Sequence, residues 1–143
     1  MTPTSAERLQ AELIAVGVER FTSRDYRVGR VLHVVLLRYR PETSDVQRDE
    51  VLTRFLALAE TERDREPYIE SIVGGPPSGG EAAEAGFEQG FVVTFASAGD
   101  RNYYVGEPVI ADSRFFDPVH ADFKRFVGPL LAPDGALVFD VAT

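Results

Sequence analysis

The sequence predicts an α+β fold of the ferredoxin-like type, in which two helices pack on one side of a four-stranded antiparallel sheet. Four segments have the apolar patterns of strands, and two segments between them have the apolar stripes of helices. After a helix near the N-terminus, these elements follow in the order β-α-β-β-α-β, which is the ferredoxin-like order. A chain of 143 residues has the size of one such domain.

The first 29 residues predict a helical extension in front of a domain that spans residues 30–143. Thr4 and Glu7 are spaced as a capping box at the start of a helix over residues 4–17. Three apolar residues then recur at spacings of four and three: Leu9, Leu13 and Val16. Because this stripe is narrow, we expect the helix to lie against the domain or against a partner subunit. An unstructured leader is the alternative.

A buried strand is predicted over residues 31–40, where β-branched and aromatic residues run up to Pro41. Side chains alternate between the two faces of a strand. One face then carries His33, Val35, Leu37 and Tyr39, and the other carries Leu32, Val34 and Leu36. Both faces are largely apolar, so both must be covered.

The first long helix is predicted to begin at Ser44, which forms a capping box with Gln47. A stripe typical of a helix on a sheet follows: Val51, Leu52, Phe55, Leu56 and Ala59. Residues 68–73 then predict a shorter strand, which the Gly- and Pro-rich residues 74–80 end.

Two further strands are predicted over residues 87–95 and 136–141, from their alternating apolar residues. Between them, Asp117 is a suitable cap for a helix that has Pro118 in its first turn and ends near Gly128.

The region before this last helix is predicted to lack regular structure. Gly99, Gly106 and Pro108 interrupt any helical pattern there. We therefore expect only short turns in it, at residues 102–105 and 111–115.

The side of the sheet without helices also carries apolar residues: Leu32, Val34, Leu36 and Val92. A monomer would expose this patch to water. Burial against a symmetric copy is the simplest way to cover it, so the sequence predicts a homodimer whose two sheets pack together.

The composition excludes several classes of function. A formal net charge of −8 is unsuited to binding nucleic acid, and the absence of cysteine rules out disulfides and thiolate chemistry. Two histidines are too few for an all-protein zinc site without carboxylates, so no metal is expected. Since the chain has no apolar stretch of signal-peptide or membrane-span length, we expect a cytoplasmic protein without membrane contact.

Three motifs resemble those of the stress-responsive A/B barrel family. They are Leu-His-Val-Val-Leu-Leu-Arg-Tyr at residues 32–39, Pro-Val-His-Ala-Asp-Phe at residues 118–123, and Leu-Val-Phe-Asp at residues 137–140. The resemblance covers residues 30–142 and implies a dimeric α+β barrel with a pocket between sheet and helices. Relatives in this family, the plant olivetolic acid cyclases, close a linear polyketide by aldol chemistry without a cofactor.

The resemblance also implies candidate catalytic residues. The cyclases use a strand histidine, a helix-start histidine and a tyrosine, which match His33, His120 and a position near Tyr103 or Tyr104. We take Tyr104 as the catalytic candidate. The chain departs from the family by about ten inserted residues at 105–116, and by Asp117 where a histidine often precedes the proline.

Chemical roles follow from the side-chain types. Imidazole titrates near neutral pH, so His120 is our candidate for the base that removes a proton beside a carbonyl. Tyr104 or His33 would donate a hydrogen bond to the enolate oxygen. The expected substrate-binding residues are mostly apolar and suit an aromatic or polyketide-like ligand: Val35, Leu37, Phe55, Phe91, Val93, Phe95, Tyr103, Arg114 and Phe123.

Other interpretations remain open at this stage. The apolar set is also what a packed core contains, and both histidines could simply satisfy buried polar groups. The protein could therefore be a cofactor-free cyclase or lyase acting on a β-dicarbonyl compound, or a non-catalytic stress-response protein that binds a small hydrophobic ligand. A cofactor-free monooxygenase is the third alternative.

Overall fold

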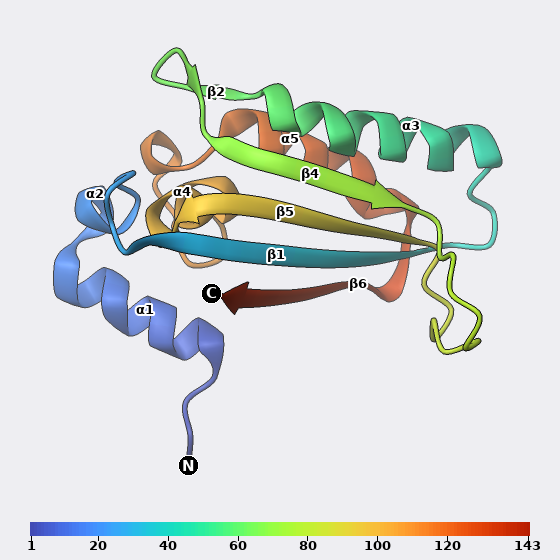
Figure 1. Ribbon diagram of the computed structural model, residues 1–143, viewed down its shortest axis with the longest axis horizontal. Helices are drawn as coiled ribbons and strands as arrows, with labels where there is room; N and C mark the ends of the chain where they lie inside the picture. The colour runs from blue at the N-terminus through green and yellow to red at the C-terminus, as the bar shows by residue number, and fades with distance from the viewer.

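A computed structural model describes all 143 residues and has the ferredoxin-like architecture expected from the sequence (Figure 1). Its sheet contains β1 (Val28–Tyr39), β4 (Ile69–Gly75), β5 (Gln89–Ser97) and β6 (Leu131–Ala142). The strand order is β4-β5-β1-β6, and every neighbouring pair is antiparallel.

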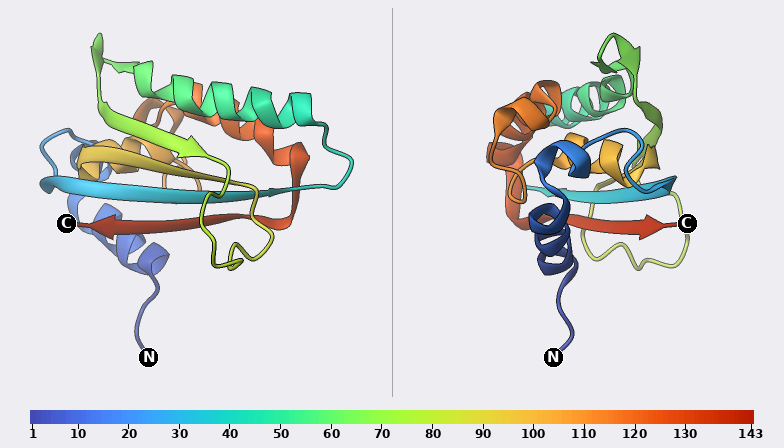
Figure 2. Two further views of the ribbon diagram at one scale, coloured as in Figure 1. Left: turned by 45° about the vertical axis from the view of Figure 1, so that its right-hand side comes forward. Right: turned by 90° about the vertical axis from the view of Figure 1, so that its left-hand side faces the viewer.

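The two long helices, α3 (Asp45–Ala57) and α5 (Pro118–Val127), cover one face of the sheet (Figure 2). Ser44 caps α3 in the predicted capping box with Gln47. Asp117 caps α5 by accepting hydrogen bonds from the amides of Val119 and His120. Short 3-10 turns follow both helices, at Leu58–Glu60 and Gly128–Leu130.

The N-terminal segment forms α1 (Ser5–Val16) and a single further turn, α2 (Val18–Phe21). The predicted capping box between Thr4 and Glu7 is present. Leu9 and Leu13 pack against the core, and Glu12 accepts a hydrogen bond of 2.6 Å from the Tyr26 hydroxyl. Helix α1 therefore lies against the domain, below β6 in the view of Figure 1.

Apart from shifts of two or three residues at strand ends, such as the start of β1 at Val28, the structure differs from the expected strands in two places. Strand β6 begins at Leu131, five residues before the predicted start, because its first residues pair with the end of β1 at Tyr39. A small hairpin of β2 (Glu62–Arg63) and β3 (Glu66–Pro67) precedes β4 and has no counterpart in the sequence prediction.

The expectation of turns alone between residues 99 and 116 is wrong for its first part, which forms helix α4 (Ala98–Val105). Ser97 caps this helix, and Gly99 lies inside its first turn. The glycine is needed because a Cβ atom there would lie 1.7 Å from the carbonyl oxygen of Ser23. Gly99 thus permits a close approach between backbones and does not break the helix. The later part does contain only a 3-10 turn, Ser113–Phe115.

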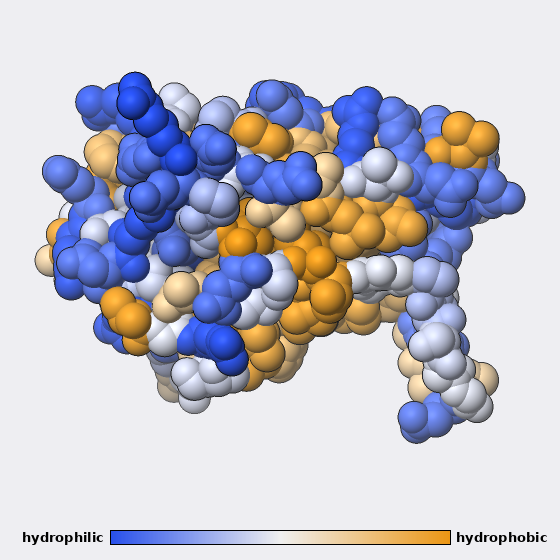
Figure 3. All heavy atoms as spheres, turned by 45° about the horizontal axis from the view of Figure 1, so that its top comes forward, coloured by the Kyte–Doolittle hydropathy of each residue, from blue (hydrophilic) through white to orange (hydrophobic).

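The two faces of the sheet differ as the alternation of β1 predicts. His33, Val35 and Leu37 are buried beneath the helices. On the other face, Val34 lies between Val92 and Phe139 of the neighbouring strands, and 64% of Phe139 is exposed. A band of apolar residues crosses the middle of the molecule in Figure 3. The core thus lies between the sheet and the helices, and the helix-free face is left open.

Replacement of Gly99 by alanine is expected to destabilise the fold by about 2 kcal/mol or more, because the new methyl group would overlap the Ser23 backbone. Chemical denaturation measures this loss. Gly128→Ala is the matched control: nothing lies within 4 Å of its added Cβ, so it should change stability by less than about 1 kcal/mol. Equal stabilities of the two variants would contradict the proposed close approach.

Candidate functional site

An apolar pocket of about 590 Å³ lies between the helix-covered face of the sheet and α5. Strand β1 supplies His33, Val35 and Leu37, while β6 supplies Ala136 and Val138. Helix α5 contributes one wall, and residues 104–108 at the end of α4 contribute another. The volume is that of a site for a small organic ligand, and most of the lining is hydrophobic.

His33 is the polar group that the sheet itself places in this pocket. The register of β1 and β6 sets His33 opposite Asp140, and His33 Nδ1 lies 2.7 Å from Asp140 Oδ1. A carboxylate can only accept here, so Nδ1 carries the proton and donates it. Nε2 is then the basic nitrogen that remains for a ligand. Only 5% of His33 is exposed, whereas 27% of the Asp140 side chain is, so the imidazole is the shielded member of this pair.

Arg101 of α4 completes the charge balance around Asp140. Its guanidinium donates a hydrogen bond of 2.8 Å to Asp140 Oδ2, and its Nε donates to the side-chain oxygen of Asn102. Burial alone would raise the pKa of Asp140. The hydrogen bonds that His33 and Arg101 donate, together with the charge of the guanidinium, outweigh that effect and hold the pKa below its usual value. Asp140 is therefore ionised and oriented.

His120 occupies the first turn of α5, with its ring stacked on that of Tyr104 at a centroid distance of 3.7 Å. Its Nδ1 donates a hydrogen bond of 2.5 Å to the Tyr104 carbonyl, which fixes the neutral tautomer and leaves Nε2 as an acceptor. Burial lowers the pKa of His120 to about 3, with help from the charges of Lys124 and His33 and against the effect of the carbonyl. This imidazole is neutral at physiological pH.

Tyr104 brings a third polar group to the pocket from helix α4. Its ring contacts both imidazoles, with a centroid distance of 5.6 Å to His33. Only 1% of the residue is exposed, yet its hydroxyl has no hydrogen-bond partner in the protein. Burial raises the pKa of this phenol, so it stays protonated. An unpaired buried donor is unfavourable, and a ligand oxygen could satisfy it.

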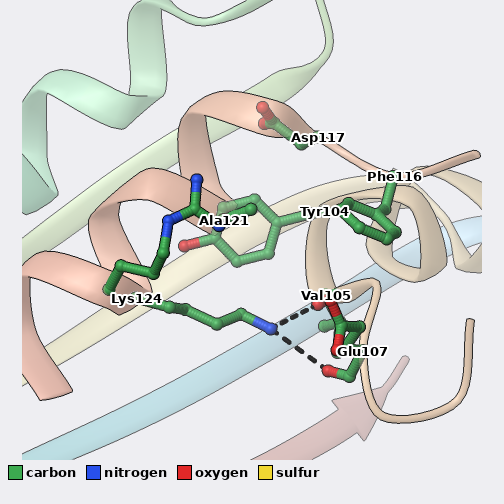
Figure 4. A pocket seen from close by; sticks show the side chains of 8 residues that line it. Tyr104, Val105, Glu107, Phe116, Asp117, Ala121 and Lys124 are labelled. Carbon is green, nitrogen blue, oxygen red and sulfur yellow. Dashed lines mark hydrogen bonds between the residues drawn. The ribbon is translucent and has the colours of Figure 1, made fainter. Parts of the chain in front are cut away.

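Lys124 lies one helical turn after His120 and reaches the rim of the pocket. Its Nζ donates hydrogen bonds of 2.6 Å to the Val105 carbonyl and 3.1 Å to the Glu107 carbonyl, as Figure 4 shows. Burial lowers the pKa of this ammonium, although the charge of Glu107 opposes the shift. A smaller cavity of about 240 Å³ adjoins the same residues on the outer side.

The structure brings together seven of the residues expected from the sequence. His33, His120 and Tyr104 all line the pocket, as do four apolar residues: Val35, Leu37, Phe55 and Phe123. The other five do not line it. Phe91, Val93 and Phe95 are buried in the core behind it. Tyr103 packs on Tyr68 and Arg63, and Arg114 is a surface residue that pairs with Asp112.

Sequence reasoning missed Asp140, Lys124 and the turn at residues 105–108 as parts of the site. Asp140 had a usable signal, because it alternates with Phe139 and Val141 and so belongs to the helix-covered face. Nothing in the local sequence signals that Lys124 turns towards the end of α4. No group of three or more His, Asp or Glu side chains is arranged to bind a metal. None of the helices is long and apolar enough to cross a membrane.

The ring of His120 is expected to stay neutral, with the proton on Nδ1, from pH 8 down to about pH 5. Nitrogen-detected NMR of the imidazole measures this, and a His33→Gln variant leaves His120 as the sole histidine for assignment. Because its folded-state pKa lies below the unfolded value of about 6.5, the unfolded chain takes up a proton first, and this group lowers stability as the pH falls below 6.5. A titration midpoint near 6.5 would contradict the burial argument.

Solved structures with this architecture come from plants and bacteria. A hydroxynitrile lyase from Passiflora edulis superposes with a TM-score of 0.61 at 21% identity, over 80% of this chain and 94% of that one. A dimeric ferredoxin-like protein of unknown function from Jannaschia sp. CCS1 gives 0.60 at 22% identity, over 80% of this chain and all of that one. A protein from Arabidopsis thaliana gives 0.61 at 20% identity, over 78% and 92%.

At these identities the structural matches show the fold alone, and the comparison with curated proteins found no match. The family is shown by sequence. The model of the Stress Responsive A/B Barrel Domain matches residues 31–142, which is more than three quarters of the chain and includes every strand of the sheet except the first residues of β1. The chain therefore belongs to the stress responsive A/B barrel domain family.

Proposed function

We propose that this protein is a cofactor-independent enzyme of the lyase type, which makes or breaks a carbon–carbon bond next to a carbonyl group in a small hydrophobic compound. The observation that carries the proposal is the buried imidazole of His33, which Asp140 orients and which lines the same apolar pocket as Tyr104, whose hydroxyl has no partner. A base and an oxygen-binding donor in one dry chamber are what such a reaction needs.

We assign the base to His33, although the sequence favoured His120. Asp140 accepts a hydrogen bond from Nδ1 of His33 and would stabilise the imidazolium that forms when Nε2 takes up a proton. His120 donates from Nδ1 to a backbone carbonyl and not to a carboxylate, and burial together with the charge of Lys124 disfavours its protonation. Its Nε2 is better suited to accept a hydrogen bond from a substrate hydroxyl and so to orient the substrate.

In an aldol closure, His33 Nε2 would remove a proton from a carbon flanked by carbonyls, and the C–H electron pair would become that of an enolate. Tyr104 would donate a hydrogen bond to the enolate oxygen. The enolate carbon would then attack a second carbonyl carbon of the same molecule. The proton held on His33 would return to the new alkoxide oxygen, which leaves the enzyme unchanged.

The lyase among the structural relatives supports this class of chemistry. Cleavage of a hydroxynitrile to a carbonyl compound and cyanide requires a base for the hydroxyl proton and no redox cofactor. Aldol closure of a linear polyketide, as in the olivetolic acid cyclases, has the same requirement for a base. The apolar walls and the volume of about 590 Å³ suit an aromatic or polyketide-like β-dicarbonyl substrate for either reaction.

Turnover is tested with a linear triketide thioester and with an aromatic cyanohydrin, with products separated by chromatography and identified by mass. We expect product with at least one of them, and His33→Ala and Tyr104→Phe should lower the rate, the former by a factor of about 10² to 10⁴. Arg114→Ala, on the surface outside the pocket, should have no effect. Tight binding of both compounds without any product would favour the ligand-binding alternative, and oxygen incorporation from O₂ would favour a monooxygenase.

The open face of the sheet supports a second proposal, that the chain is a homodimer in solution. Three structural relatives are described as dimeric. Here the open face presents Val34, Leu137 and Phe139, and the last two are 40% and 64% exposed. Large exposed apolar groups on one surface are unfavourable unless a partner covers them.

Sedimentation should find a dimer at micromolar concentration, and Phe139→Asp should convert it to a monomer by placing a charge in the apolar contact. Val46→Asp is the control, because Val46 is equally exposed but lies on α3, outside the open face. A monomeric wild-type protein with native circular dichroism would rule out this interface.

A further inference from the structure

Lys124 is the only lysine of the chain, whereas the other cationic side chains are arginines. It extends from α5 to the rim of the pocket, where it contacts the turn that follows α4. A lysine ammonium is a compact charge with three donors, unlike the planar fork of arginine. Two of its donors are used by the carbonyls of Val105 and Glu107, so one remains for another acceptor.

The charge of Lys124 is not neutralised within the protein. No carboxylate lies within ion-pair distance of its Nζ, whereas the arginines near the site are paired, Arg101 with Asp140 and Arg125 with Asp122. Glu107 contributes its backbone carbonyl, and its side chain is exposed to solvent. The protonated Lys124 therefore gives this end of an otherwise apolar pocket a positive charge without an ion-pair partner.

A second observation points to a ligand in the same place. Tyr104 also lines this pocket, and its buried hydroxyl has no partner in the protein, so two neighbouring residues of the site each have an unused donor. The protein pays desolvation for both, and the lowered pKa of Lys124 reflects this cost. A ligand with anionic and carbonyl oxygens would satisfy both donors.

We infer that Lys124 binds the carboxylate of an oxo acid and so sets which substrates this pocket accepts. The inference rests on the proposed function and narrows its substrate class. His120 and Lys124 are four residues apart on α5, and side chains at this spacing are neighbours, roughly 5–6 Å apart at Cβ. A carboxylate held by Lys124 would place a ketone a few carbon atoms further along the chain beside the imidazoles. A neutral ester of the same acid lacks the group that Lys124 recognises.

The test uses a stable probe, 5-oxo-5-phenylpentanoate, and its methyl ester, with calorimetry to measure affinity. Wild-type protein should bind the acid about tenfold more tightly than the ester, as one charge-assisted hydrogen bond provides. Lys124→Met, which keeps the length of the side chain but removes its charge, should abolish this preference while leaving ester binding within about twofold. Arg114→Met removes the same charge from the surface and should keep the preference.

Because Lys124 is the sole lysine, labelling with ¹⁵N-lysine gives a single side-chain ammonium signal, which should shift with the acid and not with the ester. Equal affinities for acid and ester in the wild type, or a preference that survives in Lys124→Met, would overturn the inference. So would a covalent adduct on Lys124 after borohydride reduction in the presence of the probe, since that outcome makes the amine a nucleophile.

Carboxylate binding by Lys124 and lyase activity can each be contradicted without the other. If the protein prefers the acid but turns over no carbonyl substrate, Lys124 is an anion-binding residue and the proposed lyase activity is wrong. If the protein turns over a carbonyl substrate but acids and esters bind equally well, the lyase activity is supported and the proposed role of Lys124 is wrong. Ester binding and the thermal midpoint of Lys124→Met show whether the variant retains its fold.

Discussion

The antiparallel pairing of β1 with β6 is the constraint on which the rest of the structure depends. β1 is an inner strand of the sheet, with β5 on one side and β6 on the other. Its register with β6 sets His33 opposite Asp140, and the same register sets Val34 opposite Phe139. Because side chains alternate, a shift of β6 by one residue would turn Asp140 to the open face and Phe139 to the helix-covered face. One pairing therefore fixes both the pocket and the open face.

The titratable groups around the pocket are arranged so that the desolvation cost of burying them is reduced. Asp140 is held between His33 and Arg101, whose hydrogen bonds offset the rise in pKa that partial burial would otherwise cause. His120 avoids the same cost by remaining neutral, with its one N–H on a backbone carbonyl. Low dielectric strengthens each of these contacts and penalises whatever is left unpaired. The unpaired groups, the Tyr104 hydroxyl and the third donor of Lys124, are for that reason the places where a ligand has most to contribute.

Helix α4 connects the core to the site. It places Arg101 on Asp140, Tyr104 between the two imidazoles and its own C-terminal turn against Lys124. Its position depends on Gly99, which lets the helix approach the backbone at Ser23, and on Asn102, which donates a hydrogen bond to the Phe21 carbonyl. The N-terminal segment thus supports the pocket by holding the helix that forms one of its walls, and Ala6 of α1 itself lines the pocket.

The sequence by itself determined the order of the elements, the two faces of β1 and the caps at Ser44 and Asp117, because alternation and capping are local properties. It also placed His33 and His120 on elements that face a common core. It could not tell which apolar side chains line the pocket and which fill the core. Phe55 and Phe91 stack on each other with a centroid distance of 3.9 Å, yet only Phe55 reaches the pocket. It treated Gly99 as a helix breaker, because the nearby Ser23 backbone is close only in space.

The tertiary structure alone decided which groups meet across the pocket. Asp140 joins His33 over 107 residues of chain, and Lys124 reaches carbonyls 17 and 19 residues before it. Such contacts follow from strand register and from the angle at which α5 crosses α4, and neither is encoded in the pattern of a short segment. The choice of base between two histidines is of the same kind, since the Nδ1 partner of each, a carboxylate for His33 and a carbonyl for His120, is brought to it by the tertiary structure.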